Sequence, residues 1–181
     1  ASELATTSSD GTARVWDVDG RPLAKLKDDQ QGSVTSIAFS GDCQRILTGS
    51  NEPAAALMWD VAGNRIGNTL KHGNSVRAVA FSPDGRFAVT GALDGLKLWD
   101  LRLQPPASKT LVQNDEVYAL TVAPGSTDAG EPWTFATGSY RTIQIWDGTG
   151  TPRPNPFKHK SIVTSMVFAG GFLVYADDQG N

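Results

Sequence analysis

The sequence predicts an all-β protein built from repeated antiparallel sheets. Short apolar runs rich in β-branched residues recur along the chain, and clusters of Gly, Pro, Asp and Asn separate them. The dipeptide Trp-Asp closes four of these runs at a nearly constant spacing. No stretch shows the 3.6-residue period of an amphipathic helix, so strands account for the whole pattern.

The clearest unit runs over residues 72–100. Residues 76–81 form an apolar strand, and residues 82–85 (SPDG) form a turn in which Pro fixes φ and Gly is free to take a positive φ. A second strand, a turn at residues 93–95 and a third strand ending in Trp99-Asp100 follow. The unit therefore predicts three antiparallel strands joined by two tight turns.

Comparison of the chain with itself reveals the same unit several times. The Trp-Asp closures lie 43, 40 and 47 residues apart, at Trp16, Trp59, Trp99 and Trp146. Apolar strands with a shared pattern precede the last three closures, and a fourth such strand follows them; they begin at Val34, Val76, Val117 and Val163. A fixed period of this length is typical of proteins in which each repeat is one small sheet.

The remaining strands follow from the same alternation of apolar runs and turns. In chain order, the expected strands are residues 3–8, 12–18 and 22–27; 33–40, 45–50, 55–60 and 65–70; an outer strand near 109–112; 117–123, 133–138 and 142–147; and 162–169 and 172–176. An insertion rich in Gly, Ser, Asp and Pro at residues 124–132 lengthens the fourth unit.

These repeats resemble the WD40 family, whose period, four strands per blade and terminal Trp-Asp they share. The resemblance implies a β-propeller of WD40 type, with about four blades' worth of four-stranded antiparallel sheets, cut within a repeat at both ends. It divides residues 1–181 into a partial blade at about 3–28, blades at about 33–70, 75–112 and 116–159, and a partial blade at 162–181.

The resemblance also implies a structural tetrad in which His bonds both a hydroxyl and a turn Asp, and the hydroxyl meets the Trp N–H. The matching residues are His72, Thr90, Asp94 and Trp99. The same residue types could form a nucleophilic triad, but nothing in the sequence indicates an oxyanion hole. The other units match less well: His159 fits the histidine position, Gln30 and Gln113 replace it, and Pro53 and Tyr140 stand at the turn-Asp position.

In the WD40 family, the loops that enter the inner strand and the turns before the Trp-Asp strand share one face, which commonly binds partners. The resemblance places six residues on this face: Asn51, Glu52, Asn74, Leu93, Tyr140 and Arg141. We add Trp133, which lies outside the Trp-Asp series, to this candidate face as a further partner anchor; the alternative is a strand residue packed on its neighbours.

Composition limits the remaining possibilities. A net charge of −3 argues against a nucleic-acid surface, and the short basic clusters at residues 25–27 and 153–160 fit solvated strand edges. The single cysteine, Cys43, excludes an internal disulfide framework and a cysteine metal cluster, and it favours a cytoplasmic setting. No apolar run approaches the roughly 18 residues of a membrane-spanning helix.

The sequence thus predicts a protein-protein interaction platform or scaffold that has no chemistry, cofactor or metal of its own. Two alternatives stay open: a sensor or recognition module of a larger signalling or defence protein, and an enzyme of propeller fold. The expected partners are proteins, with neither nucleic acid nor membrane among them. We also expect the missing blades to come from a longer chain or from a second copy.

Overall fold

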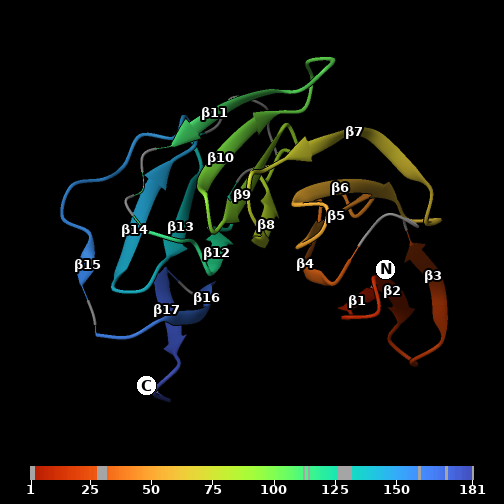
Figure 1. Cartoon of the computed structure of the whole chain (residues 1–181), viewed down its shortest axis with the longest axis horizontal. Coiled ribbons are helices and arrows are strands. Elements are labelled where there is room, and N and C mark those ends of the chain that lie inside the picture. Colours follow the sequence, from red (N-terminus) through yellow and green to blue (C-terminus); the bar gives the residue numbers. More distant parts are fainter. Residues whose placement is uncertain are drawn as a thin grey trace.

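The computed structural model describes residues 3–27, 32–111, 113, 115–125, 132–158, 160–169 and 171–180. It contains seventeen strands in five antiparallel sheets, and no helix occurs in this part of the chain. Figure 1 shows the sheets following one another along an arc, in the manner of propeller blades. The structure therefore confirms the predicted all-β propeller class.

The strands of each sheet are neighbours in the sequence as well as in space. The first sheet contains β1 (Glu3–Thr7), β2 (Thr12–Asp17) and β3 (Pro22–Lys27), and the second contains β4 (Val34–Phe39), β5 (Arg45–Ser50), β6 (Ala55–Asp60) and β7 (Arg65–Lys71). The third contains β8 (Val76–Phe81), β9 (Phe87–Ala92), β10 (Gly95–Asp100) and β11 (Ala107–Leu111). The fourth contains β12 (Ala119–Val122), β13 (Thr134–Gly138), β14 (Thr142–Asp147) and β15 (Phe157–Lys158), and the last contains β16 (Val163–Ala169) and β17 (Phe172–Asp177).

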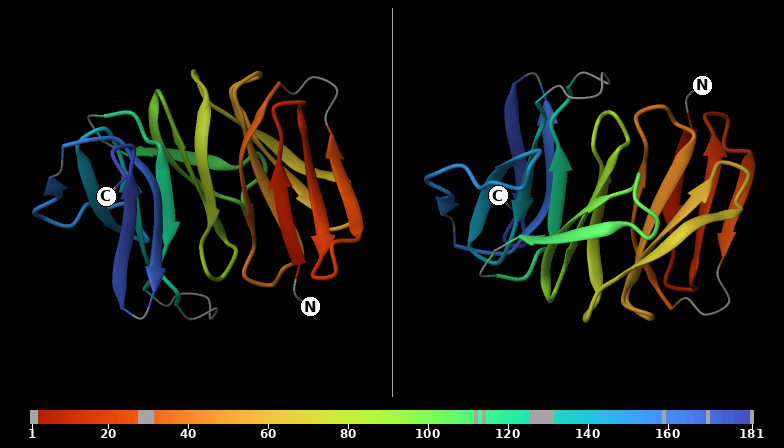
Figure 2. Two further views of the ribbon diagram at one scale, coloured as in Figure 1. Left: turned by 90° about the horizontal axis from the view of Figure 1, so that it is seen from below. Right: turned by 90° about the horizontal axis from the view of Figure 1, so that it is seen from above.

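The strands β4, β8, β12 and β16 line the inner side of the arc, and each contacts the next. Figure 2 shows that the turns between strands gather at two opposite ends of the array. We call these the His72 end, which carries the β5–β6, β9–β10 and β13–β14 turns, and the Asp100 end, which carries the β6–β7, β10–β11 and β14–β15 turns.

Neighbouring sheets are joined by a backbone hydrogen bond that recurs at the His72 end. The N–H of Val117 donates to the Ala92 carbonyl at 3.2 Å, and the N–H of Val163 donates to the Ser139 carbonyl at the same distance. Val34 makes the equivalent bond to Ser8 at 3.1 Å. The leading Val of a unit therefore closes the preceding sheet as well as starting its own.

The same Val residues explain a recurring glycine at the end of the second strand of a sheet, whose role the sequence analysis did not recognise. A Cβ placed on Gly91 would lie 2.3 Å from a Val117 methyl, and one placed on Gly138 would lie 2.6 Å from a Val163 methyl. Only a residue without a side chain permits this approach. The recurring Thr-Gly pair at the end of the second strand was the available signal, since it appears in three units.

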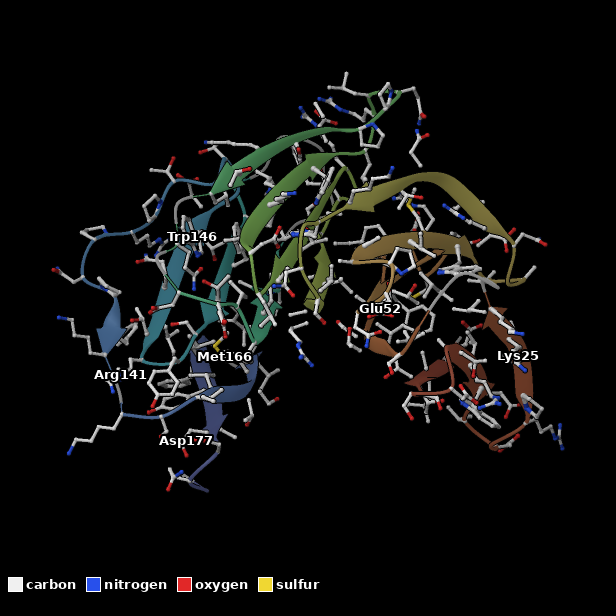
Figure 3. The ribbon with its side chains drawn as sticks, viewed as in Figure 1. Lys25, Glu52, Arg141, Trp146, Met166 and Asp177 are labelled. Atoms are coloured by element: carbon white, nitrogen blue, oxygen red, sulfur yellow. The ribbon has the colours of Figure 1, made fainter. Side chains whose placement is uncertain are left out.

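The core is divided between the sheets. Trp59 packs with Val15 and Leu26 of the first sheet, and Trp146 packs with Val89 and Leu98 of the third sheet. Each Trp of the Trp-Asp series after the first thus packs against the preceding sheet. Figure 3 marks Trp146 on the fourth sheet. Burying a side chain of this size supplies a large part of each interface.

The Asp of each Trp-Asp pair caps the turn that follows it. The Asp147 carboxylate accepts hydrogen bonds from the backbone N–H groups of Thr149 and Thr151, both at 2.9 Å. Asp60 accepts a bond from the Asn64 N–H at 2.8 Å, and Asp17 from the Arg21 N–H at 2.8 Å. The dipeptide therefore combines a core anchor with a turn cap.

Candidate functional site

The structure brings His72, Thr90, Asp94 and Trp99 into one hydrogen-bonded chain. His72 Nδ1 lies 2.8 Å from Asp94 Oδ1, and His72 Nε2 lies 2.6 Å from Thr90 Oγ1. The indole N–H of Trp99 donates to Thr90 Oγ1 at 2.8 Å. The chain runs from the exposed turn at the His72 end into the buried face of the third sheet.

One assignment of protons satisfies every atom of this chain. His72 Nδ1–H donates to the ionised Asp94, and Nε2 accepts from the Thr90 hydroxyl, which in turn accepts from Trp99. The imidazole is therefore neutral, and its second nitrogen cannot carry a proton without breaking the bond from Thr90.

The electrostatics agree with this neutral form. Burial lowers the pKa of His72, and this effect exceeds the opposing influence of the Asp94 carboxylate. Burial alone would raise the pKa of Asp94, but hydrogen bonds from the Gly73 N–H and from His72 hold that pKa below its ordinary value. The pair thus combines a neutral imidazole with an ionised carboxylate.

The Trp–Thr bond recurs in the other sheets, but the rest of the tetrad does not. Trp59 donates to Thr48 at 2.8 Å, Trp146 to Thr137 at 2.9 Å, and Trp16 to Thr6 at 2.9 Å. In the fourth sheet Thr137 donates onward to Gln113 Oε1 at 2.7 Å. Gln113 therefore occupies the place of the histidine, whereas Gln30 and His159 lie outside the described residues.

Strand pairing corrects one predicted equivalence. Thr90 pairs with Lys97 across the β9–β10 hairpin, and Thr137 pairs with Gln144 across the β13–β14 hairpin. Counting from these pairs aligns Asp94 with Arg141, not with Tyr140. The error arose because the hairpin register, which fixes the alignment, could not be read from the turn residues alone.

The tetrad geometry does not suit nucleophilic catalysis. The His72 side chain has no exposed surface, and Trp99 is 7% exposed. A base buried this deeply cannot reach a substrate in this conformation. Among the described residues, no group of three or more His, Cys, Asp or Glu could hold a metal ion.

Six of the predicted partner-binding residues lie at the His72 end. They occupy the turns and connections of three successive sheets: Asn51, Glu52, Asn74, Leu93, Tyr140 and Arg141. Glu52, Asn74, Tyr140 and Arg141 are exposed, whereas Asn51 and Leu93 are half-buried. Figure 3 shows Glu52 and Arg141 on different sheets of the arc.

Two of these side chains contact each other. The Arg141 guanidinium lies 5.0 Å from the centre of the Tyr140 ring, and Tyr140 is 46% exposed. Asn74 and Leu93 have more local roles: Asn74 Oδ1 accepts a bond from the Ser75 N–H, and the Leu93 N–H donates to the Ser75 carbonyl. The Tyr140–Arg141 pair therefore presents an exposed aromatic ring together with a cation at this end.

Trp133 lies at the opposite end from the other six residues. It directly precedes β13, whose first residue Thr134 pairs with Asp147 at the Asp100 end. Its ring stacks between Phe87, with centroids 6.2 Å apart, and Phe135, with centroids 5.5 Å apart. The inclusion of Trp133 in one face with Tyr140 was therefore wrong, because strand direction carries the two residues to opposite ends.

No helix in the described part of the chain is long and apolar enough to cross a membrane. The family model "WD domain, G-beta repeat" matches residues 2–17, 20–52 and 64–100. These segments include the Trp-Asp closures at Trp16 and Trp99, whereas the closure at Trp59 lies between two of them.

Curated relatives carry the same repeat. The chain is 26% identical to nuclear distribution protein nudF of Aspergillus niger over 180 residues, which cover 97% of this chain and 35% of the relative. It is 36% identical to WD40 repeat protein poxJ of Penicillium oxalicum over 127 residues, which cover 66% of this chain and 36% of the relative. It is also 36% identical to transcription initiation factor TFIID subunit 5 of Caenorhabditis elegans over 103 residues, which cover 56% of this chain and 16% of the relative.

The chain thus spans about a third or less of the length of these relatives. The family match, the WD40 relatives and the recurring Trp–Thr bond inside four-stranded antiparallel sheets all agree. This chain belongs to the WD40-repeat family.

Proposed function

We propose that this chain is a protein-interaction platform without chemistry of its own, and that it binds its partner at the His72 end. The observation that carries the proposal is the exposed Tyr140–Arg141 pair on the β13–β14 turn. Tyr and Arg are enriched among the residues that dominate binding energy. A turn anchored at both strands by regular pairing holds them at low entropic cost.

Polar residues of the second and third sheets lie at the same end of the array. Glu52 and Asn74 are exposed there, whereas Asn51 and Leu93 are half-buried. Exposed polar residues are typical of the rim of a protein interface. We propose that a partner spans several sheets across this end.

The test is capture of partners by the immobilised chain, followed by mass spectrometry. The parent is compared with a double variant, Tyr140→Ala with Arg141→Ala, and with a matched control, Val18→Ala with Arg21→Ala. Val18 and Arg21 are exposed on the β2–β3 turn at the Asp100 end. Proteins lost from the Tyr140 variant but retained by the control would support the proposal, whereas equal capture by all three proteins would contradict it.

A sensor or recognition module within a larger protein is the second candidate. The observation that favours it is the chain's coverage of only 35% and 36% of the lengths of nudF and poxJ. An effector fused to the propeller would be visible in a longer sequence. An enzyme of propeller fold is the third candidate, and the buried His72 gives it no support.

We also propose that further sheets cover the two outer faces of the array. Phe172 is 75% exposed and Val174 is 54% exposed on the last sheet, and Leu4 is 60% exposed on the first. Exposed apolar faces of this kind mark contact surfaces. The covering sheets would come from a longer chain or a second copy, and the blades would follow the boundaries expected from the sequence.

Light scattering on the isolated chain tests this arrangement. We expect self-association, because apolar faces left in water bind each other. A well-folded monomer at micromolar concentration would contradict both sources of additional sheets.

The net charge and the single cysteine support two further parts of the proposal, a partner that is not nucleic acid and a cytoplasmic setting. A net charge of −3 gives no electrostatic basis for nucleic acid as a partner. Cys43 is exposed and unpaired, which fits a reducing, cytoplasmic setting.

A further inference from the structure

A groove opens between the third and fourth sheets at the Asp100 end, away from the proposed interaction face. It encloses about 730 Å³, a volume that falls within the ~300–1,000 Å³ range of ligand sites. Phe87, Leu98 and Trp133 form its apolar wall. Because both sheets belong to this chain, the groove is complete without any further blade.

Trp133 differs from every other Trp in its hydrogen bonding. The four Trp residues of the Trp-Asp series donate their indole N–H groups to threonine hydroxyls. Trp133 donates to no acceptor among the described residues, and its ring edge lies against Gly148, where a Cβ would be 2.2 Å from Nε1. Trp133 thus lines the groove with an indole N–H that no described residue accepts.

Carboxylates from three separate segments also line the groove. Asp100 is paired with Arg102 at 2.9 Å and with Arg86 at 3.5 Å. In contrast, the hydrogen bonds that Asp84 and Asp147 accept from described residues all end on Oδ1. Two carboxylate oxygens, the Oδ2 atoms of Asp84 and Asp147, are left for a ligand.

The cations of the groove already have partners. The Arg86 guanidinium lies 4.6 Å from the centre of the Phe87 ring in addition to its contact with Asp100, and Lys109 Nζ donates to the Thr149 carbonyl at 2.9 Å. The lining residues carry three carboxylates against two cations, and Arg102, which pairs with Asp100 from beside the groove, supplies a third cation. Asp84 and Asp147 form no ion pair within 4.0 Å with a described residue. An incoming cation would meet acceptors, whereas an incoming anion would meet carboxylates.

We infer that this groove binds an extended peptide of a partner protein that presents an arginine or lysine side chain. A backbone carbonyl of the peptide accepts the Trp133 N–H. The basic group lies between Asp84 and Asp147, and its aliphatic stem packs on Trp133 and Leu98. A peptide suits the groove because it supplies a carbonyl acceptor, an apolar stem and a cation together.

The first test uses a capped pentapeptide, acetyl-Ala-Ala-Arg-Ala-Ala-amide, and two counterparts with citrulline or glutamate in place of arginine. The readout is the set of indole N–H signals in ¹H–¹⁵N NMR spectra, with the Trp133 signal identified by its absence in Trp133→Phe. Titration to about 10 mM detects dissociation constants of a few millimolar. This comparison needs no variant that alters folding.

We expect the arginine peptide to shift the Trp133 signal saturably while the other indole signals stay in place. The citrulline peptide, which keeps the shape of arginine but not its charge, should bind at least about fivefold more weakly. A larger shift with the glutamate peptide, equal shifts with all three, or no shift at all would overturn the inference.

The second test combines Asp84→Asn with Asp147→Asn, which keeps each Oδ1 acceptor and removes the charges. The matched control is Asp60→Asn, since Asp60 caps the equivalent turn of the second sheet and does not line the groove. We expect the double variant to lose at least about fivefold in affinity for the arginine peptide and the control to match the parent. Unchanged signals from Trp59, Trp99 and Trp146 show that the variant is folded, and equal affinity in a folded double variant would overturn the inference.

Discussion

The third and fourth sheets make the same bond in their interiors and differ where their turns meet solvent. Trp99 donates to Thr90 at 2.8 Å, and Trp146 donates to Thr137 at 2.9 Å. The third sheet extends this bond through His72 to Asp94, whereas the fourth sheet ends it at Gln113. The Nε2 of Gln113 is buried and has no hydrogen-bond partner among the described residues.

This difference shows which part of the repeat the fold requires. The Trp–Thr bond pairs polar groups inside each of the four sheets that carry a Trp-Asp strand, so it recurs. The residues beyond it lie at the His72 end, where Arg141 stands in the place of Asp94. Variation is therefore concentrated at the end that we propose binds partners, and the interior stays the same.

The largest expected effect comes from the interior. Trp99→Ala and Trp146→Ala should each lower the free energy of unfolding by about 3–5 kcal/mol, because they remove a large buried side chain and leave a threonine hydroxyl without its donor. Trp16→Ala should cost less than about 2 kcal/mol, since Trp16 is only half-buried. Denaturant titration measures all three. A loss below about 1 kcal/mol for Trp99→Ala would contradict the role of the buried pair.

The next effect separates the two sheets. His72→Ala removes bonds to both Asp94 and Thr90 and should cost about 1–3 kcal/mol. Gln113→Ala removes one accepted bond and an amide whose Nε2 is unsatisfied, so it should cost about 1 kcal/mol or less. Both values come from denaturant titration under the same conditions. If Gln113→Ala were the more damaging change, the histidine extension would not stabilise the third sheet.

A smaller effect depends on pH. The pKa of His72 is lowered by burial from its ordinary value of 6.5, so on acidification the unfolded chain takes up a proton that the folded chain resists. The His72 contribution to stability is thus complete above about pH 6.5 and declines as the pH falls below it. Gln at position 72 does not titrate, and Gln113 shows that the site accepts this residue type.

The measurement is the unfolding free energy of the parent and of His72→Gln between pH 7.5 and pH 5. We expect the advantage of the parent over the variant to shrink toward pH 5. His159 is present in both proteins, so its titration cancels in the difference. An advantage that stays constant or grows with acid would show that His72 is not held in the neutral form.

The repeat made most of the fold predictable from the sequence. Trp-Asp spacing and the SPDG turn were sufficient to locate the strands, and Gly85 has the expected positive φ of 65°. The tetrad residues were found because their types and order match the family. Local pattern could not show the hairpin register that aligns Asp94 with Arg141 or the end at which Trp133 lies, since both depend on strand direction in space.

The groove was not predictable for a related reason. Trp133 and Asp147 meet across the β13–β14 hairpin, and the packing of the third sheet on the fourth brings Asp84 to the same groove. In the sequence, Asp84 and Asp147 are turn residues. Capping a turn accounts for an Asp at each position, so the sequence gives no indication that the same carboxylates also line a groove.

The central claim is that the exposed Tyr140–Arg141 pair at the His72 end serves binding and that the buried residues of the interior serve folding. The most direct test is the unfolding free energy of the Tyr140→Ala, Arg141→Ala double variant. We expect it to lie within about 0.5 kcal/mol of the parent, because both side chains are exposed and contact mainly each other. A loss above about 1 kcal/mol would assign the pair to the fold and contradict the claim.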